Sequence, residues 1–150
     1  MSPIRCEIVT QERVVFDEMV EMVIAPGVDG ELGILPHHVP LLTALAPGEL
    51  RVKKIQEEES FAISGGFMEV LPDHVSVLAR TAEHADEIDF SRAEAARARA
   101  EELLREGPPP DMSRLAAIET ALRRSQIRLK VARKRKHRPG PGPMMGMDEE

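Results

Sequence analysis

The character of this chain changes abruptly near residue 85, and that change constrains the fold more than any other feature of the sequence. Before it, short apolar runs are separated by dipeptides that favour turns, such as Pro26-Gly27 and Pro72-Asp73. After it, residues 89–105 contain five alanines and no glycine, proline or valine, a composition typical of a helix. The sequence therefore predicts a β domain at residues 1–86, followed by helices.

The first part is expected to be all-β. Ile4, Cys6 and Ile8 alternate with other residues, so they share one face of a strand. Strand-like runs recur at residues 19–25, 50–52, 61–63, 67–71 and 75–78. Many short strands with glycine and proline between them indicate a sandwich or barrel of about 80 residues. Cys6 is expected in its core, and a lone cysteine cannot form an intramolecular disulfide.

The second part is expected to be a helical hairpin at residues 87–137. Asp89 or Ser91 can cap the first helix, and Glu94 completes a capping box with Ser91. The sequence Gly-Pro-Pro-Pro at residues 107–110 ends it, and a second helix follows. The expected buried stripe of that helix is Leu115, Ile118, Leu122, Ser125, Leu129 and Ala132. Alanine-rich packing predicts weak docking and hence a movable element, and residues 138–150 are expected to be a disordered tail.

Charge divides the chain in the same way. Residues 1–90 carry a net charge of −11 and residues 91–150 a net charge of +5, with nine basic residues and no acidic residue in 121–138. The basic run has three interpretations: a solvated helix face, a nucleic-acid contact or a contact with an acidic protein. Arg124 and Arg128 lie on one helix face and, with Arg92 or Arg99, could bind phosphate.

Catalytic and metal motifs are hard to find. The adjacent His37 and His38 would point to opposite faces of a strand, and no metal-binding spacing occurs. Ser64 before Gly65-Gly66 fits neither a nucleophile elbow nor a P-loop, so a turn or bulge is expected there. The longest uncharged segment, residues 32–48, contains three prolines and two histidines, which argues against a membrane span. The first ten residues lack a signal-peptide pattern, and the single cysteine fits a reducing compartment.

Two segments carry a resemblance to a known family. Residues 30–42 read GELGILPHHVPLL and residues 64–70 read SGGFMEV. In this order and spacing they closely resemble two segments of the epsilon subunits of F-type ATP synthases, and the similarity extends from residue 4 to about 135. The resemblance implies a sandwich of about ten strands followed by a two-helix hairpin.

That resemblance also implies a function without catalytic or metal-binding residues. Epsilon subunits belong to the rotating central stalk, bind the gamma subunit and rest on the c-ring, and their hairpin can inhibit ATP hydrolysis. Glu31 and His38 match positions near the rotor contact and are expected at one exposed end of the sandwich. The basic helix is expected to contact the beta subunit through Arg123, Lys130, Arg133 and Lys134. The implied location is the cytoplasmic face of a bacterial membrane, which the chain reaches only through its complex.

A regulatory ATP site is implied as well, although no cofactor is required. Residues 88–93 read IDFSRA and match the family's I/L-D-x-x-R-A motif. Further matching positions are Glu83, Arg99, Arg124 and Arg128. The implied site comprises Glu83, Ile88, Asp89, Arg92, Ala93, Arg99, Arg124 and Arg128. ATP is expected to favour the compact hairpin because Asp89, Arg92, Arg124 and Arg128 converge only there.

Two other functions remain open from the sequence. The basic helix could belong to a stand-alone nucleic-acid-binding module, although the chain has no tryptophan or tyrosine for base stacking. A small sandwich enzyme is the second alternative, and it would need a deep pocket lined by glutamate and histidine. Binding to a gamma subunit rather than to nucleic acid distinguishes the stalk role from the first alternative.

Overall fold

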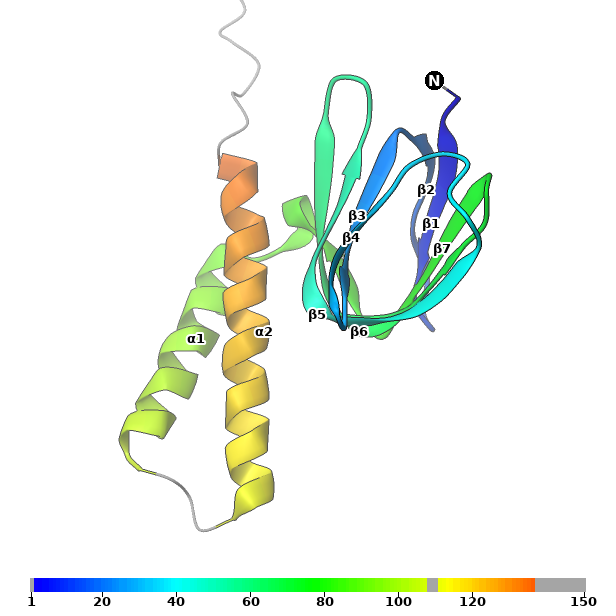
Figure 1. Cartoon of the computed structure of the whole chain (residues 1–150). Helices are drawn as coiled ribbons and strands as arrows, with labels where there is room; N and C mark the ends of the chain where they lie inside the picture. Colours follow the sequence, from blue (N-terminus) through cyan, green and yellow to red (C-terminus); the bar gives the residue numbers. More distant parts are fainter. Residues whose placement is uncertain (1, 108–110, 137–150) are drawn as a thin grey trace, which may run out of the picture.

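The computed structural model describes residues 2–107 and 111–136. It contains a β-sandwich and two α-helices beside it (Figure 1). The strands are β1 (Ile4–Val9), β2 (Val14–Val20), β3 (Met22–Gly27), β4 (Gly30–Ile34), β5 (Leu41–Lys53), β6 (Glu58–Val70), β7 (His74–Ala79) and β8 (Ala82–His84). A 3-10 turn, η1 (Ala85–Glu87), leads into α1 (Phe90–Arg105), and α2 (Met112–Lys136) follows. The predicted order of sandwich and helical hairpin is confirmed.

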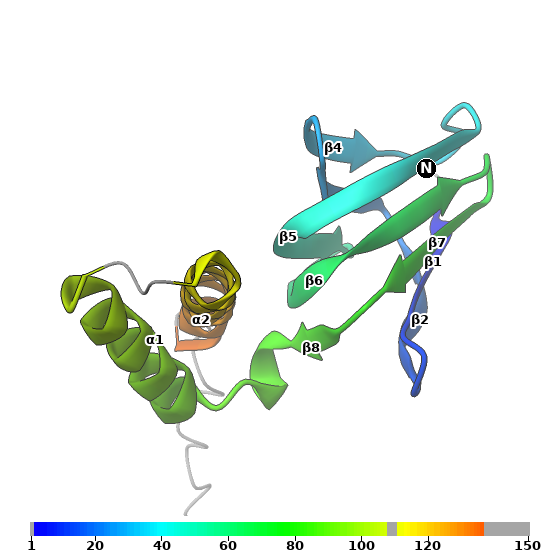
Figure 2. The ribbon, with the colours of Figure 1, turned by 90° about the horizontal axis from the view of Figure 1, so that it is seen from below.

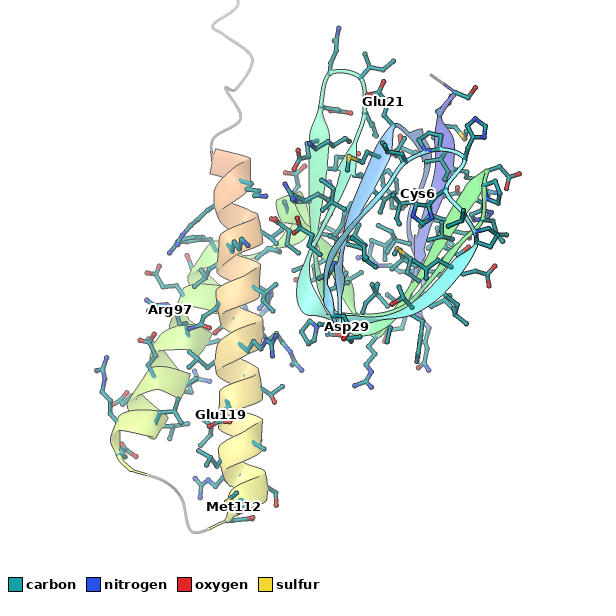
Figure 3. The ribbon with its side chains drawn as sticks, viewed as in Figure 1. Cys6, Glu21, Asp29, Arg97, Met112 and Glu119 are labelled. Carbon is teal, nitrogen blue, oxygen red and sulfur yellow. The ribbon has the colours of Figure 1, made fainter. Side chains whose placement is uncertain are left out.

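The strands form one continuous hydrogen-bonded sheet in the order β2-β1-β7-β6-β5-β3-β4, and β8 pairs with β6. All neighbouring strands are antiparallel except β1 and β7, which are parallel. The long strands β5 and β6 bend, so the sheet closes around a single core (Figure 1). Ile4, Cys6 and Ile8 are all fully buried in this core, as their alternation predicts, and Figure 3 places Cys6 inside the sandwich.

The described residues form eight strands, and a glycine pair bends one of them where the sequence predicted a turn or bulge. Gly65 and Gly66 have φ angles of +102° and +148°, which other residues rarely adopt. Pairing nevertheless continues on both sides, with Ser64 opposite Pro47 and Gly66 opposite Leu45. The expected runs at residues 61–63 and 67–71 are therefore both parts of β6.

The two helices pack along the predicted faces. Asp89 caps α1, since its carboxylate accepts a hydrogen bond from the Arg92 amide at 3.0 Å, and Ser91 lies inside the first turn. Of the expected stripe on α2, Ile118, Ser125, Leu129 and Ala132 are buried, and Leu115 and Leu122 are half-buried. Small residues on α1, Ala93 and Ala100, are buried as well. The expected disordered tail lies outside the described residues.

The second helix lies between α1 and the sandwich (Figure 2). A small apolar cluster joins the two domains: Ala62, Ala85, Ile88, Val131 and Ala132, with Phe90 and Ile127 beside them. Only Ile88 and Val131 among the buried members are larger than alanine, so the hairpin docks through a small contact. No helix in the described part of the chain is long and apolar enough to cross a membrane.

Candidate functional site

A pocket of about 360 Å³ lies between the sandwich and α2, a size typical of small-molecule sites. The sandwich contributes the polar side chains of Ser64, Arg80, Thr81 and Glu83. The helix contributes Thr120, Arg123, Arg124 and Arg128. The pocket therefore exists only while the hairpin is docked, because each domain supplies one wall.

Glu83 and Arg128 connect the two walls. Arg128 Nε lies 3.0 Å from Glu83 Oε1, and Arg128 Nη2 donates a hydrogen bond to Glu83 Oε2 at 3.1 Å. Among the described residues that line the pocket, Glu83 is the only one with a carboxylate. Three other arginines line the pocket and form no ion pair within the described ranges: Arg80, Arg123 and Arg124. The pocket therefore has an excess of positive charge suited to an anion.

The structure does not bring all of the expected nucleotide-binding residues together. Glu83, Arg124 and Arg128 line the pocket, whereas Ile88 and Ala93 are buried and do not line it. Asp89 caps α1, and Arg92 and Arg99 are exposed on that helix. The expected convergence of Asp89, Arg92, Arg124 and Arg128 is not found, because α1 lies on the side of α2 away from the sandwich (Figure 2).

Among the expected partner contacts on α2, Lys134 already has a partner within the chain. Its ammonium group lies 2.7 Å from Glu49 Oε1 on β5, and the Glu49 side chain is only 8% exposed. Lys130 and Arg133 are exposed, and Arg123 lines the pocket. In the docked hairpin, Lys134 is therefore paired within the chain, although the sequence predicts that it contacts a partner subunit.

Glu31 and His38, the residues expected at the rotor contact, lie on either side of most of β4. Glu31 follows the β3–β4 turn and forms an ion pair with Arg51 at 3.1 Å. His38 lies beyond the other end of β4, next to His37, whose amide donates to the carbonyl of Pro72. Glu31 is exposed and His38 is half-exposed, so both remain accessible.

A polar network fixes the junction where β8 leads into η1. His84 Nδ1 accepts a hydrogen bond from the Asp86 amide at 3.1 Å, and His84 Nε2 lies 2.9 Å from Glu59 Oε1. Burial opposes the charged form of Glu59, but hydrogen bonds from Lys54 and His84 outweigh it and lower the pKa of the carboxyl group. Arg13 pairs with Glu87 at 2.8 Å. These contacts hold the linker against the sandwich.

An apolar patch lies on the outer face of the sheet. Phe67 on β6 is opposite Leu78 on β7, and Leu42 on β5 lies on the same face. Their side chains are 58%, 56% and 70% exposed. Neighbouring exposed apolar residues of this kind mark interaction surfaces.

Sequence reasoning missed Arg80 and Glu49. Arg80 is the only lysine or arginine between Lys54 and Arg92, and that isolation in an acidic segment was an available signal. Glu49 gave no signal, because its contact with Lys134 depends on the docked position of α2. No group of three or more metal-ligating side chains is found in the described residues.

The fold and pocket define a class: a two-domain protein in which a charged helical hairpin packs against a β-sandwich. Residues 3–85 match the family described as "ATP synthase, Delta/Epsilon chain, beta-sandwich domain". Residues 86–133 match the one described as "ATP synthase, Delta/Epsilon chain, long alpha-helix domain". The chain belongs to the ATP synthase delta/epsilon family, and the resemblance seen in residues 30–42 and 64–70 is confirmed.

Relatives match over almost their whole length. The ATP synthase epsilon chain of Herpetosiphon aurantiacus is 56% identical over 136 residues, covering 91% of this chain and 98% of the relative. That of Dehalococcoides mccartyi is 52% identical over 139 residues, covering 93% and 99%. A chain in the Euglena gracilis mitochondrial ATP synthase structure (OSCP/F1/c-ring) has a TM-score of 0.75 at 26% identity, with 88% and 82% coverage. A chain from the Tetrahymena thermophila central stalk and c-ring, at 13% identity and TM-score 0.61, shares the fold.

Proposed function

We propose that this chain is a non-catalytic central-stalk subunit of a proton-translocating F-type ATP synthase and couples c-ring rotation to ATP synthesis. The observation that carries the proposal is the 56% identity to an epsilon chain over 98% of that relative's length. Members of this family are non-catalytic subunits, and ATP synthesis and proton transport are activities of the whole complex. The chain acts at the cytoplasmic face of a bacterial membrane, as a peripheral component.

Three surfaces suit three partners in this role. The apolar patch of Leu42, Phe67 and Leu78 suits a stable contact with the gamma subunit, because such contacts bury apolar area permanently. Glu31, exposed beside the β3–β4 turn, suits a polar contact with the c-ring, and His38, beyond the other end of β4, suits a second and separate polar contact with the rotor. Arg123, Lys130, Arg133 and Lys134 suit an acidic surface of the beta subunit.

The hairpin is the regulatory element of the proposal. When docked, Lys134 is paired with Glu49 and Arg128 with Glu83. An extended hairpin frees these charges for the beta subunit and inhibits ATP hydrolysis. ATP in the pocket favours the docked form, because a ligand shifts an equilibrium by its differential affinity for the two states.

The test of the stalk role is association with gamma. The tagged chain, incubated with the purified subunits of its ATP synthase, is expected to retain gamma in a pull-down. Phe67→Ser is expected to weaken retention at least ten-fold, since it removes the aromatic residue of the patch. Val14→Ser, at another exposed apolar position, serves as the control. Retention of nucleic acid in place of gamma would refute the proposal and favour the stand-alone nucleic-acid-binding module.

A further inference from the structure

Four arginines are among the described residues that line the pocket, and Arg80 is the one that the sandwich supplies, whereas Arg123, Arg124 and Arg128 belong to α2. We infer that Arg80 binds phosphate, so that a nucleoside triphosphate in the pocket is held by the sandwich and by α2 at the same time. This inference rests on the regulatory nucleotide site of the proposed function. It adds a residue that controls how tightly the ligand links the two domains.

The backbone of Arg80 is fixed by the glycine bend in β6. The Arg80 amide donates a hydrogen bond to the Gly65 carbonyl at 3.0 Å. The next amide, that of Thr81, donates to the Ser64 hydroxyl at 3.0 Å, and the Ser64 amide donates to the Thr81 carbonyl at 3.2 Å. Arg80 therefore extends from a rigid part of the sandwich, so only its side chain, and not its backbone, has to become ordered around a ligand.

The charges around the pocket leave Arg80 available for an anion. The Glu83 carboxylate is already paired with Arg128, whose Nε lies 3.0 Å from Glu83 Oε1. No ion pair involves the guanidinium group of Arg80 in the part of the chain that the structure describes. A guanidinium group binds phosphate oxygens through two parallel hydrogen bonds. Arg80 from the sandwich faces the same pocket as Arg123 and Arg124 from α2, an arrangement suited to a polyphosphate.

The position of Arg80 also explains how a ligand can act on the hairpin. A ligand bound by α2 alone would move with the helix and would not change the docking equilibrium. Contacts with Arg80 and with α2 together exist only in the docked form. Each such contact adds to the differential affinity, and docking is stabilised as the ligand concentration rises above its dissociation constant.

The experiment is isothermal titration of the full-length chain with ATP and, separately, with inorganic tripolyphosphate. Arg80→Gln is expected to raise the dissociation constants of both ligands about ten-fold, which corresponds to a loss of about 1.4 kcal/mol of binding free energy. Arg80→Lys keeps the charge and is expected to recover part of the loss. Arg114→Gln, an exposed change near the start of α2, is expected to leave both constants unchanged.

The outcomes separate this inference from the proposal beneath it. If the parent chain binds ATP and Arg80→Gln binds it equally well, the assignment of Arg80 is overturned and the nucleotide site stands. If Arg80→Gln and Arg114→Gln weaken binding equally, the effect is general electrostatics and the assignment is again overturned. If the parent chain binds neither ligand, both the nucleotide site and the role of Arg80 are wrong. The stalk role is tested independently by the gamma pull-down.

Discussion

Replacing Val131 by alanine is expected to release the hairpin while leaving the sandwich intact. Val131 is fully buried in the cluster that joins α2 to the sandwich. The only other buried member larger than alanine is Ile88. The replacement removes two methyl-sized groups from the contact, each contributing about 0.8 kcal/mol.

The expected loss is about 2 kcal/mol once a small cavity is included, or roughly a thirty-fold shift of the docking equilibrium. Alanine has a higher helix propensity than valine, but this gain applies to docked and undocked α2 alike. It therefore cancels in the docking equilibrium. Few apolar groups join the domains, so a change of this size is a large fraction of the docking free energy.

The measurement is energy transfer between dyes on cysteines introduced at exposed positions, Gln11 in the sandwich and Ala116 on α2. The native Cys6 is fully buried, so it does not take up dye in the folded protein. Val39→Ala makes the same chemical change at a site that is 71% exposed. Equal docking in the two variants would refute the argument for weak docking. A sandwich destabilised together with the docking contact would show that the domains are not energetically separate.

Three further outcomes follow from the sandwich. Gly66→Ala is expected to lower the free energy of unfolding, measured by urea titration, by more than about 4 kcal/mol, because the new Cβ would lie 2.0 Å from the Leu78 carbonyl oxygen. Gly30→Ala is the control, since Gly30 also has a positive φ but lies in open space. It is expected to lower the free energy of unfolding by about 1 kcal/mol. Burial raises the pKa of the Cys6 thiol to about 12, so at pH 8 a thiol reagent is expected to react only as the sandwich opens, and rapid labelling of the native protein would contradict the buried assignment. The pKa of Glu59 is lowered in the folded state, so the ionised carboxylate stabilises the fold above its unfolded pKa, and this stabilisation is lost as the pH falls below about 4.5. In thermal melts at different pH, Glu59→Gln is expected to reduce this loss of stability in acid.

The sequence predicted what depends on local pattern. Alternation placed Ile4, Cys6 and Ile8 in the core, and helical spacing placed Ile118, Ser125 and Leu129 on the buried face of α2. The break in composition predicted the succession of sandwich and hairpin. These features follow from the period of the side chains along each element, which can be read without knowing the tertiary structure.

What the sequence could not predict depends on contacts between distant elements. Gly65-Gly66 carries the signature of a turn, yet partners on β5 and β7 keep the strand paired through the bend. The motif at residues 88–93 suggested one shared site, but the packing order of α1 and α2 decides which of its residues reach the pocket. Glu49 and Arg80 acquire their roles only because α2 docks where it does.

Burial of Glu49 makes the docked state easier to reverse than its ion pairs suggest. The Glu49 side chain is 8% exposed and pairs with Lys134 at 2.7 Å, and Arg51 on its own strand lies 3.6 Å away, so little water reaches this charged group in the docked state. That desolvation offsets much of the attraction between the two charges. When the hairpin leaves, the carboxylate regains water and Lys134 becomes free for an acidic partner, so neither change is strongly opposed. The ion pair thus sets the geometry of docking while adding little to its free energy, which leaves the small apolar cluster and any ligand in the pocket to decide the position of the hairpin.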